Sequence, residues 1–145
     1  MKRYAWAVLG LGLGAAGLGA SAESVLGQTP PPQPTVELRQ NYPNPFNPTT
    51  TIPFSLRGEL FLNGHRPVVS LRIYNVLAQV VAIPVLRGTG QRLDSLPLSC
   101  PSTLGCSYSA YWDGSGSGRP VASGVYIYQL VVDGLRFTKK MIVVK

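Results

Sequence analysis

Few side chains in this sequence could carry out chemistry at a catalytic centre. His65 is the only histidine, so a serine or cysteine nucleophile paired with histidine would have to use it. No carboxylate lies near His65 in the sequence to orient its ring. The acids that could serve as a general acid and base are scattered over turns and expected strand ends: Glu37, Glu59, Asp94, Asp113 and Asp133. We therefore expect a protein that is not an enzyme and has no catalytic residues.

The two cysteines, Cys100 and Cys106, are closely spaced. In an exported chain, a close and even pair of cysteines most often forms a disulfide. A metal site is the alternative, but two thiols without a nearby histidine cannot complete a tetrahedral shell. A redox-active pair would normally be set closer together, at a helix start. The sequence therefore predicts a Cys100–Cys106 disulfide, with no metal site and no cofactor.

Two other groups of residues suggest ligand binding only superficially. The run from Gly114 to Gly118 lacks the lysine and the following helix that a phosphate loop requires, so it predicts a turn. Five aromatic side chains could stack on a sugar, as in a lectin: Tyr108, Tyr111, Trp112, Tyr126 and Tyr128. In a small β-sandwich, such residues more often pack in the core and at its rim.

The first 22 residues have the form of a secretory signal peptide. Lys2 and Arg3 precede an apolar run over residues 4–19, and small residues at 20–22 offer a cleavage site. A membrane anchor is the alternative, although the run is shorter than the ~20 residues that a spanning helix needs. We therefore expect the chain to be exported.

The exported part is expected to begin with a tether, residues 23–35, whose prolines favour an extended, solvated chain. Residues 36–145 suffice for one domain with a core. The formal net charge of the chain is +7, and its basic residues form no block. A nucleic-acid partner is therefore not expected, whereas the charge would suit lipopolysaccharide-rich surroundings.

A β-hairpin is predicted at the end of the chain. Residues 125–132 and 135–144 read as strands, joined by Asp133-Gly134, a dipeptide that tolerates the positive φ angles of a two-residue turn. The predicted pairs that share the apolar face are Val132 with Leu135, Leu130 with Phe137, Tyr128 with Lys139, and Tyr126 with Met141. A lone hairpin is marginal in water, so upstream strands must cover this face.

Further strands are predicted at residues 36–39, 49–56, 68–74, 79–85 and 108–112, and residues 58–67 could form a hairpin tip or a decorated loop. Pro53 indicates that its strand lies at an edge or carries a bulge. Tyr42 and Phe46 are expected to pin the proline-rich loop between the first two strands onto the domain. Short strands separated by turn signals predict an all-β fold, a small antiparallel sandwich.

Three blocks together resemble a known family. QNYPNPFNPTTTIPFSL (40–56), VSLRIYNVLAQVV (69–81) and YWDGSGSGRPVASGVYIYQLVVDGLRFTKKMIVVK (111–145) are similar to the C-terminal sorting domain of proteins exported by the type IX (Por) secretion system. They also resemble the Ig-like domain of the flagellar hook-capping protein. The resemblance covers residues 36–145 and implies an Ig-like β-sandwich of about seven strands.

The resemblance also implies site residues. The export and recognition signal would comprise Gly124, Val125, Tyr126, Lys139, Lys140, Met141, Ile142, Val143, Val144 and Lys145. The family opening motif would comprise Asn41, Pro43, Asn44, Pro45, Phe46, Asn47 and Pro48. The implied partner is the outer-membrane secretion machinery, or another envelope protein, with association with a lipopolysaccharide surface after passage through the periplasm.

The sequence departs from the family at several places. Ala78 stands where the family usually has glycine, which costs roughly 1 kcal/mol if that position needs positive φ. Ser115-Gly116 replaces a further aspartate, so Asp113 is expected to cap a turn rather than hold calcium. Residues 58–67 and the cysteine loop look like insertions. Only the tether separates the expected signal peptide from the domain, where the family has a cargo.

The leading hypothesis is a non-enzymatic, exported β-sandwich module that the export machinery recognises and delivers to the cell surface, the outer membrane or the extracellular space. The alternative is a structural subunit of an extracellular filament or envelope assembly, which would self-assemble through exposed strand edges.

Overall fold

The computed structural model describes residues 34–145, which form one compact unit. The expected signal peptide, residues 1–22, lies outside the described residues, as does the expected tether apart from its last two positions. No helix within the described part has the length and apolar character to cross a membrane.

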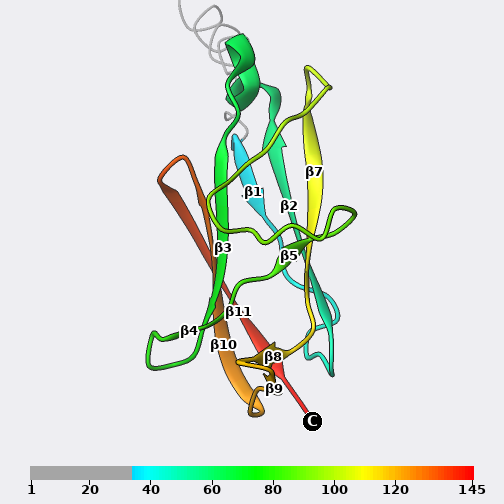
Figure 1. Ribbon diagram of the computed structural model, residues 1–145, viewed down its shortest axis with the longest axis vertical. Coiled ribbons are helices and arrows are strands. Elements are labelled where there is room, and N and C mark those ends of the chain that lie inside the picture. The colour runs from blue at the N-terminus through cyan, green and yellow to red at the C-terminus, as the bar shows by residue number, and fades with distance from the viewer. Residues whose placement is uncertain (1–33) are drawn as a thin grey trace, which may run out of the picture. The chain divides into compact units, whose positions relative to one another are not determined.

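Two antiparallel sheets make up most of this unit (Figure 1). The first has the order β1-β2-β7-β5 and consists of β1 (Val36–Leu38), β2 (Thr50–Arg57), β7 (Gly105–Trp112) and β5 (Val85–Leu86). The second has the order β11-β10-β3-β4, with β6 also paired to β3, and consists of β11 (Leu135–Val143), β10 (Gly124–Val132), β3 (Val68–Tyr74), β4 (Val80–Ala82) and β6 (Leu96–Pro97). A small ribbon joins β8 (Ser115–Gly116) to β9 (Arg119–Pro120).

The hydrophobic core comes from alternate residues of these strands. Ile52 on β2, Leu71 on β3 and Leu130 on β10 are each fully buried. This alternation is the pattern of sheets that turn one face inward. The prediction of an all-β, Ig-like antiparallel sandwich is confirmed, and seven of its strands have three or more residues.

The terminal hairpin forms as the sequence predicts. Val132 pairs with Leu135, and Tyr126 pairs with Met141, with the intervening pairs in the same register. Asp133 and Gly134 adopt φ angles of 47° and 87°, as this two-residue turn requires. β3 pairs with the other side of β10, so the hairpin is part of a larger sheet, and the buried residues of this sheet share one core with those of the first sheet.

The expectation that Pro53 marks an edge strand is wrong, because β2 has β1 on one side and β7 on the other. The bulge alternative fits the register. Leu38 pairs with Phe54, and Tyr42 forms a bridge with Thr51, so the partner segment advances four residues while β2 advances three. The Arg39 N–H donates to the Pro53 carbonyl at 3.0 Å, so Arg39 lies opposite Pro53 and the extra residue lies opposite Ile52. Proline has no N–H to return this bond, and the Arg39 carbonyl accepts from the Tyr128 hydroxyl instead.

The single strand predicted at residues 79–85 is also wrong. The chain forms β4 against β3, crosses between the sheets at Ile83 and Pro84, and then forms β5 against β7. A continuous apolar run cannot distinguish one buried strand from two short strands in opposite layers, because both are apolar throughout.

Residues 58–67 form neither a hairpin tip nor an open loop. They contain the 3-10 helix η2 (Gly58–Gly64), which packs against the cysteine loop. Cys100 and Cys106 form the predicted disulfide, with their Cα atoms 5.9 Å apart. The Gly58 N–H donates to the Leu104 carbonyl at 3.2 Å, and a Cβ atom at position 58 would collide with the Thr103 carbonyl. The two insertions therefore support each other at one end of the sandwich.

Candidate recognition site

The structure brings the two predicted groups of site residues together. The loop that carries the opening motif, residues 40–48, runs along the outer edge of β11 near the C-terminus. The Phe46 N–H donates to the Ile142 carbonyl, and the Val144 N–H donates to the Phe46 carbonyl, each at 3.0 Å. Phe46 and Val143 thus form a parallel bridge, and this part of β11 is paired on both sides.

Side chains of the loop extend this contact along β11. The Ile142 N–H donates to Asn44 Oδ1 at 2.9 Å, and Gln40 Nε2 donates to the Lys140 carbonyl at 2.8 Å. A small hollow of about 240 Å³ lies between the loop and the hairpin. It is lined by Gln40, Asn44, Val125, Lys140 and Ile142.

Buried residues anchor the opening loop. The Asn41 side chain donates to Thr50 Oγ1 at 3.0 Å and to the Pro43 carbonyl at 3.2 Å, which fixes the first turn of the loop. The ring of Phe46 is buried and meets Trp112 edge-on, with the ring centroids 5.4 Å apart. The prediction that Phe46 pins the loop is confirmed. The same prediction for Tyr42 is wrong, because its side chain is 57% exposed and only its backbone is bonded to the sheet.

An aromatic series links the loop to the hairpin. Trp112 lies between Phe46 and Tyr126, and its centroid is 6.1 Å from that of Tyr126. Trp112 Nε1 donates to the Ser115 carbonyl, and the Tyr126 hydroxyl donates to the Ala122 carbonyl. The aromatic residues of this series therefore serve packing, with their polar atoms satisfied by backbone.

The remaining predicted signal residues divide into two sets. Tyr126, Met141 and Val143 are buried in the core. Exposed or partly exposed positions are Gly124, Val125, Lys139, Lys140, Ile142, Val144 and Lys145. Only the second set can be contacted by a partner without unfolding the hairpin.

Tyr128 was predicted as a packing residue, but its hydroxyl also fixes the start of the opening loop. It donates to the Arg39 carbonyl at 2.8 Å and accepts from the Asn41 N–H at 3.0 Å. The side chain is fully buried, and this burial raises the pKa of Tyr128 to about 12, although the Asn41 bond acts in the opposite direction. A tyrosine on the apolar face of a strand was the only sign of this role in the sequence.

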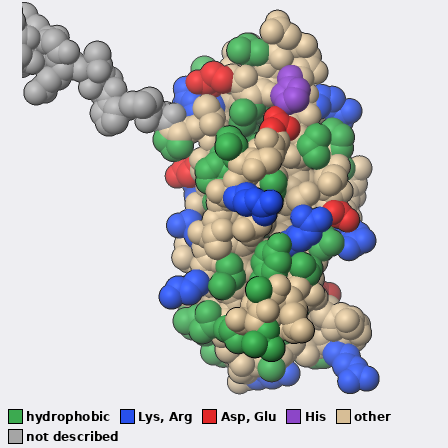
Figure 2. Space-filling view, turned by 90° about the vertical axis from the view of Figure 1, so that its left-hand side faces the viewer, with side chains coloured by type: hydrophobic (Ala, Val, Ile, Leu, Met, Phe, Trp, Pro, Cys, Tyr) green, Lys and Arg blue, Asp and Glu red, His purple; other side chains and the backbone are tan. Residues whose placement is uncertain are grey.

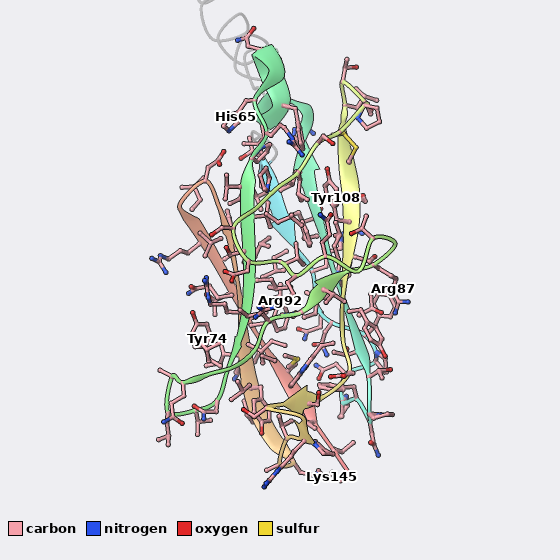
Figure 3. All side chains as sticks on the ribbon, in the orientation of Figure 1. His65, Tyr74, Arg87, Arg92, Tyr108 and Lys145 are labelled. Atoms are coloured by element: carbon pink, nitrogen blue, oxygen red, sulfur yellow. A yellow bond between two sulfur atoms is a disulfide. The ribbon has the colours of Figure 1, made fainter. Side chains whose placement is uncertain are left out.

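His65 and Asp133, which are distant in sequence, meet at the other end of the sandwich, away from Lys145 (Figure 3). His65 Nε2 lies 2.8 Å from Asp133 Oδ2, and Asp133 Oδ1 accepts from the Val68 N–H at 2.9 Å. The backbone bond, followed by the His65 contact, lowers the pKa of Asp133. Asp133 also occupies the hairpin turn, so the pair serves to hold this turn against the start of β3.

Asp113 caps a turn, as expected. Its carboxylate accepts from the Ser115 N–H at 3.0 Å, at the start of the β8–β9 ribbon. Gly114, with φ of 79°, is tightly enclosed because a Cβ atom there would collide with the Pro48 carbonyl of the opening loop. Among residues 34–145, no group of three or more His, Cys, Asp or Glu side chains is placed to hold a metal ion.

A second hollow, of about 360 Å³, lies beside β5 and β7 and includes Arg92, Tyr111 and Asp113 in its lining. One face of the Tyr111 ring is already occupied, because the Arg87 guanidinium lies 4.9 Å from its centroid. This arrangement favours the packing interpretation of the aromatic residues.

The outer surface around the hairpin is apolar and basic. Val125 and Ile142 form a cross-strand pair, and each is more than 40% exposed. Lys140 pairs with Ile127 beside them. Figure 2 shows the side of the molecule that is on the left in Figure 1, with Lys and Arg side chains set among hydrophobic ones.

Neither the family models nor the curated proteins with which the chain was compared gave a match.

Proposed function

We propose that this chain is a non-enzymatic, exported β-sandwich module whose C-terminal strand is recognised by outer-membrane export machinery, as in the type IX sorting domains that it resembles. Delivery would end at the cell surface, the outer membrane or the extracellular space. The observation that carries the proposal is the pairing of the opening loop with Ile142 and Val144.

Through this pairing, the opening motif stabilises the C-terminal strand that carries the expected export signal. The final residues of a chain usually fray. Here Phe46 and Asn44 hold them in the sheet, so Lys140, Ile142 and Lys145 are presented on a fixed framework. A pre-organised surface loses less conformational entropy on binding than a disordered tail would.

The proposal needs a test that separates recognition from folding. Deletion of residues 139–145 would remove Met141 and Val143 from the core, so loss of export would have two explanations. Exposed residues should be changed instead. The test variant combines Lys140→Ser, Ile142→Ser and Lys145→Ser, and the matched control combines Leu62→Ser, Arg66→Ser and Leu104→Ser near η2 and the cysteine loop.

Surface delivery would be measured by protease accessibility of the tagged chain on intact cells, together with the thermal stability of each purified variant. We expect the test variant to remain in the periplasm and the control to reach the surface. If the test variant folds and is delivered like the unaltered chain, the sorting proposal is wrong.

A structural subunit of a filament or envelope assembly is the second candidate. It is favoured by the position of β11 at the edge of its sheet. Pairing of two copies along this edge would bring Arg136 and Lys140 close to the same charges on the neighbour, which is unfavourable. Sedimentation at rising protein concentration tests this candidate, and growth into long assemblies would support it.

A further inference from the structure

The outer edge of β11 is only half covered. Ile142 directs both its N–H and its carbonyl to the opening loop, away from β10. Because residues two apart in a strand direct their backbone groups the same way, Arg136, Thr138 and Lys140 also direct theirs away from β10. The loop reaches only as far as the Lys140 carbonyl, where Gln40 donates.

The other half of this edge offers unused backbone groups. Within the described part of the chain, no hydrogen bond reaches the outward N–H groups of Arg136, Thr138 and Lys140 or the outward carbonyls of Arg136 and Thr138. All three residues are exposed. A row of this kind can pair with an added strand.

The charged side chains along the open edge are all basic and lack carboxylate partners. Arg136 Nη1 donates to the neutral Gln129 amide oxygen at 3.1 Å. Neither Lys139 nor Lys140 forms an ion pair with any residue in the range 34–145.

The Asp and Glu side chains of residues 34–145 are already engaged elsewhere. Glu37 contacts Arg39, Glu59 contacts Arg57, Asp94 contacts Arg72, Asp133 contacts His65, and Asp113 accepts from Ser115. Neutralisation of the open edge would therefore have to come from an acidic partner, while a second copy would add positive charge.

The two faces at this edge differ, which constrains the partner further. The side chains of Arg136, Thr138 and Lys140 lie on the outer face, because they share it with their exposed or half-exposed pair partners on β10. The side chain of Phe137 points to the opposite face, where it packs partly buried against the core. Lys139, two residues further along β11, shares that face with Phe137. A strand added here would have one row of side chains beside Arg136 and Lys140 and the other beside Phe137 and Lys139.

We propose that the open half of β11, residues 136–140, binds an extended acidic segment of a partner protein by strand addition, with acidic and apolar side chains alternating along the segment. The inference rests on the proposed function, because it names the chemistry of the partner that recognises this strand. It leaves aside the Lys140 carbonyl and the residues beyond it, which the opening loop covers.

The probe is a fluorescein-labelled peptide with capped ends and the sequence Glu-Val-Glu-Val-Glu-Val, titrated with the full chain and followed by fluorescence anisotropy. We expect saturable binding that weakens with added salt, since charge attraction is screened. A peptide with lysine in place of glutamate should bind at least about tenfold more weakly.

Backbone pairing is tested by two further peptides, one N-methylated at its Glu residues and the other at its Val residues. Only one set of N–H groups can face β11, so methylation should weaken binding by about tenfold or more in one peptide and leave the other nearly unchanged. Equal binding of both, or equal loss in both, would contradict strand addition.

The matched pair of protein variants is Thr138→Pro and Thr138→Ala. The N–H at position 138 points away from β10, so proline there removes an outward donor without breaking the hairpin ladder. We expect Thr138→Pro to bind the acidic peptide about tenfold more weakly and Thr138→Ala to bind it within about twofold of the unaltered chain. If Thr138→Pro fails to fold, the methylated peptides still test strand addition with the unaltered chain.

The outcomes separate this inference from the proposed function. If peptide binding depends on the edge but Thr138→Pro is delivered to the surface normally, the acidic-strand site is supported and export does not require it. Absence of peptide binding would overturn the inference, and the basic residues would then serve to repel other strands, while the surface-delivery test would still stand.

Discussion

The hydroxyl of Tyr128 donates a hydrogen bond to the Arg39 carbonyl at 2.8 Å, across the interior of the sandwich. Tyr128 belongs to β10 in one sheet, and Arg39 follows β1 in the other. The same hydroxyl accepts from the Asn41 N–H. A single side chain therefore joins the two layers and fixes the point where the opening loop leaves the first sheet.

We predict that Tyr128→Phe destabilises the domain by about 1–3 kcal/mol, because it leaves the Arg39 carbonyl and the Asn41 N–H without their partner. Tyr126→Phe is the matched control, since that hydroxyl donates only to Ala122 and is less buried. It should cost about 0.5–1.5 kcal/mol. Equilibrium unfolding in urea measures both losses. Equal losses would show that the two Tyr128 bonds stabilise the domain no more than the single Tyr126 bond does.

The free energy of unfolding at alkaline pH should also depend on the Tyr128 hydroxyl. The pKa of Tyr128 is about 12 in the folded state and about 10 in the unfolded chain. Protonated Tyr128 therefore contributes stability that is fully present below pH 10 and is lost as the pH rises toward 12. Between these values the unaltered protein should lose about 2 kcal/mol more than Tyr128→Phe does. Parallel loss in the two proteins would rule out a raised pKa at this site.

Ala78 adopts φ of 63°, a left-handed conformation that costs energy for a residue with a Cβ atom. We predict that Ala78→Gly stabilises the domain by about 0.5–1 kcal/mol, the strain relief being partly offset by the greater entropy of glycine in the unfolded chain. Ala122→Gly is the control, because this exposed position has no positive φ and should lose stability. A lower unfolding midpoint for Ala78→Gly would contradict the assignment of strain.

Asp133 should make stability depend on acid. The hydrogen bond from the Val68 N–H is the larger cause of its lowered pKa, and the His65 contact is the smaller one. The stability that ionised Asp133 contributes is therefore present above the ordinary aspartate pKa and is lost as the pH falls through its lower pKa in the folded state. We predict that Asp133→Asn costs about 0.5–1 kcal/mol near neutral pH and that the difference disappears in strong acid. His65→Gln should cost less, because the Val68 bond remains. Unfolding curves at both pH values provide the measurement.

Local sequence signals specify the elements whose conformation depends on neighbours in the chain. Asp133-Gly134 determined the hairpin register, and the alternation of Ile52, Phe54 and Leu56 determined which face of β2 is buried. The division of residues 79–85 between two sheets was missed, since it depends on the packing of distant strands. For Pro53 the sequence allowed an edge or a bulge, and it could not choose between them, because the bulge depends on an extra residue in the segment that follows β1.

The candidate site was predictable as two lists of residues, but their contact was not. Phe46 and Val143 pair across nearly the whole length of the domain sequence, and no local pattern reports such a pairing. The same holds for His65 and Asp133. They are far apart in the sequence, and only the fold brings their side chains into contact. Gln40, which reaches Lys140, carried no signal beyond its position beside the opening motif.

The chain enters the sandwich at β1, near η2, and its C-terminus leaves at the opposite end (Figure 1). Tension applied between these points would pull β1 lengthwise along β2 and pull β11 lengthwise along β10, so many ladder bonds would bear the load at once rather than open one by one. The domain is thus arranged as a mechanically resistant link, and pulling of single molecules from residues 34 and 145 should show one high-force rupture, not gradual extension.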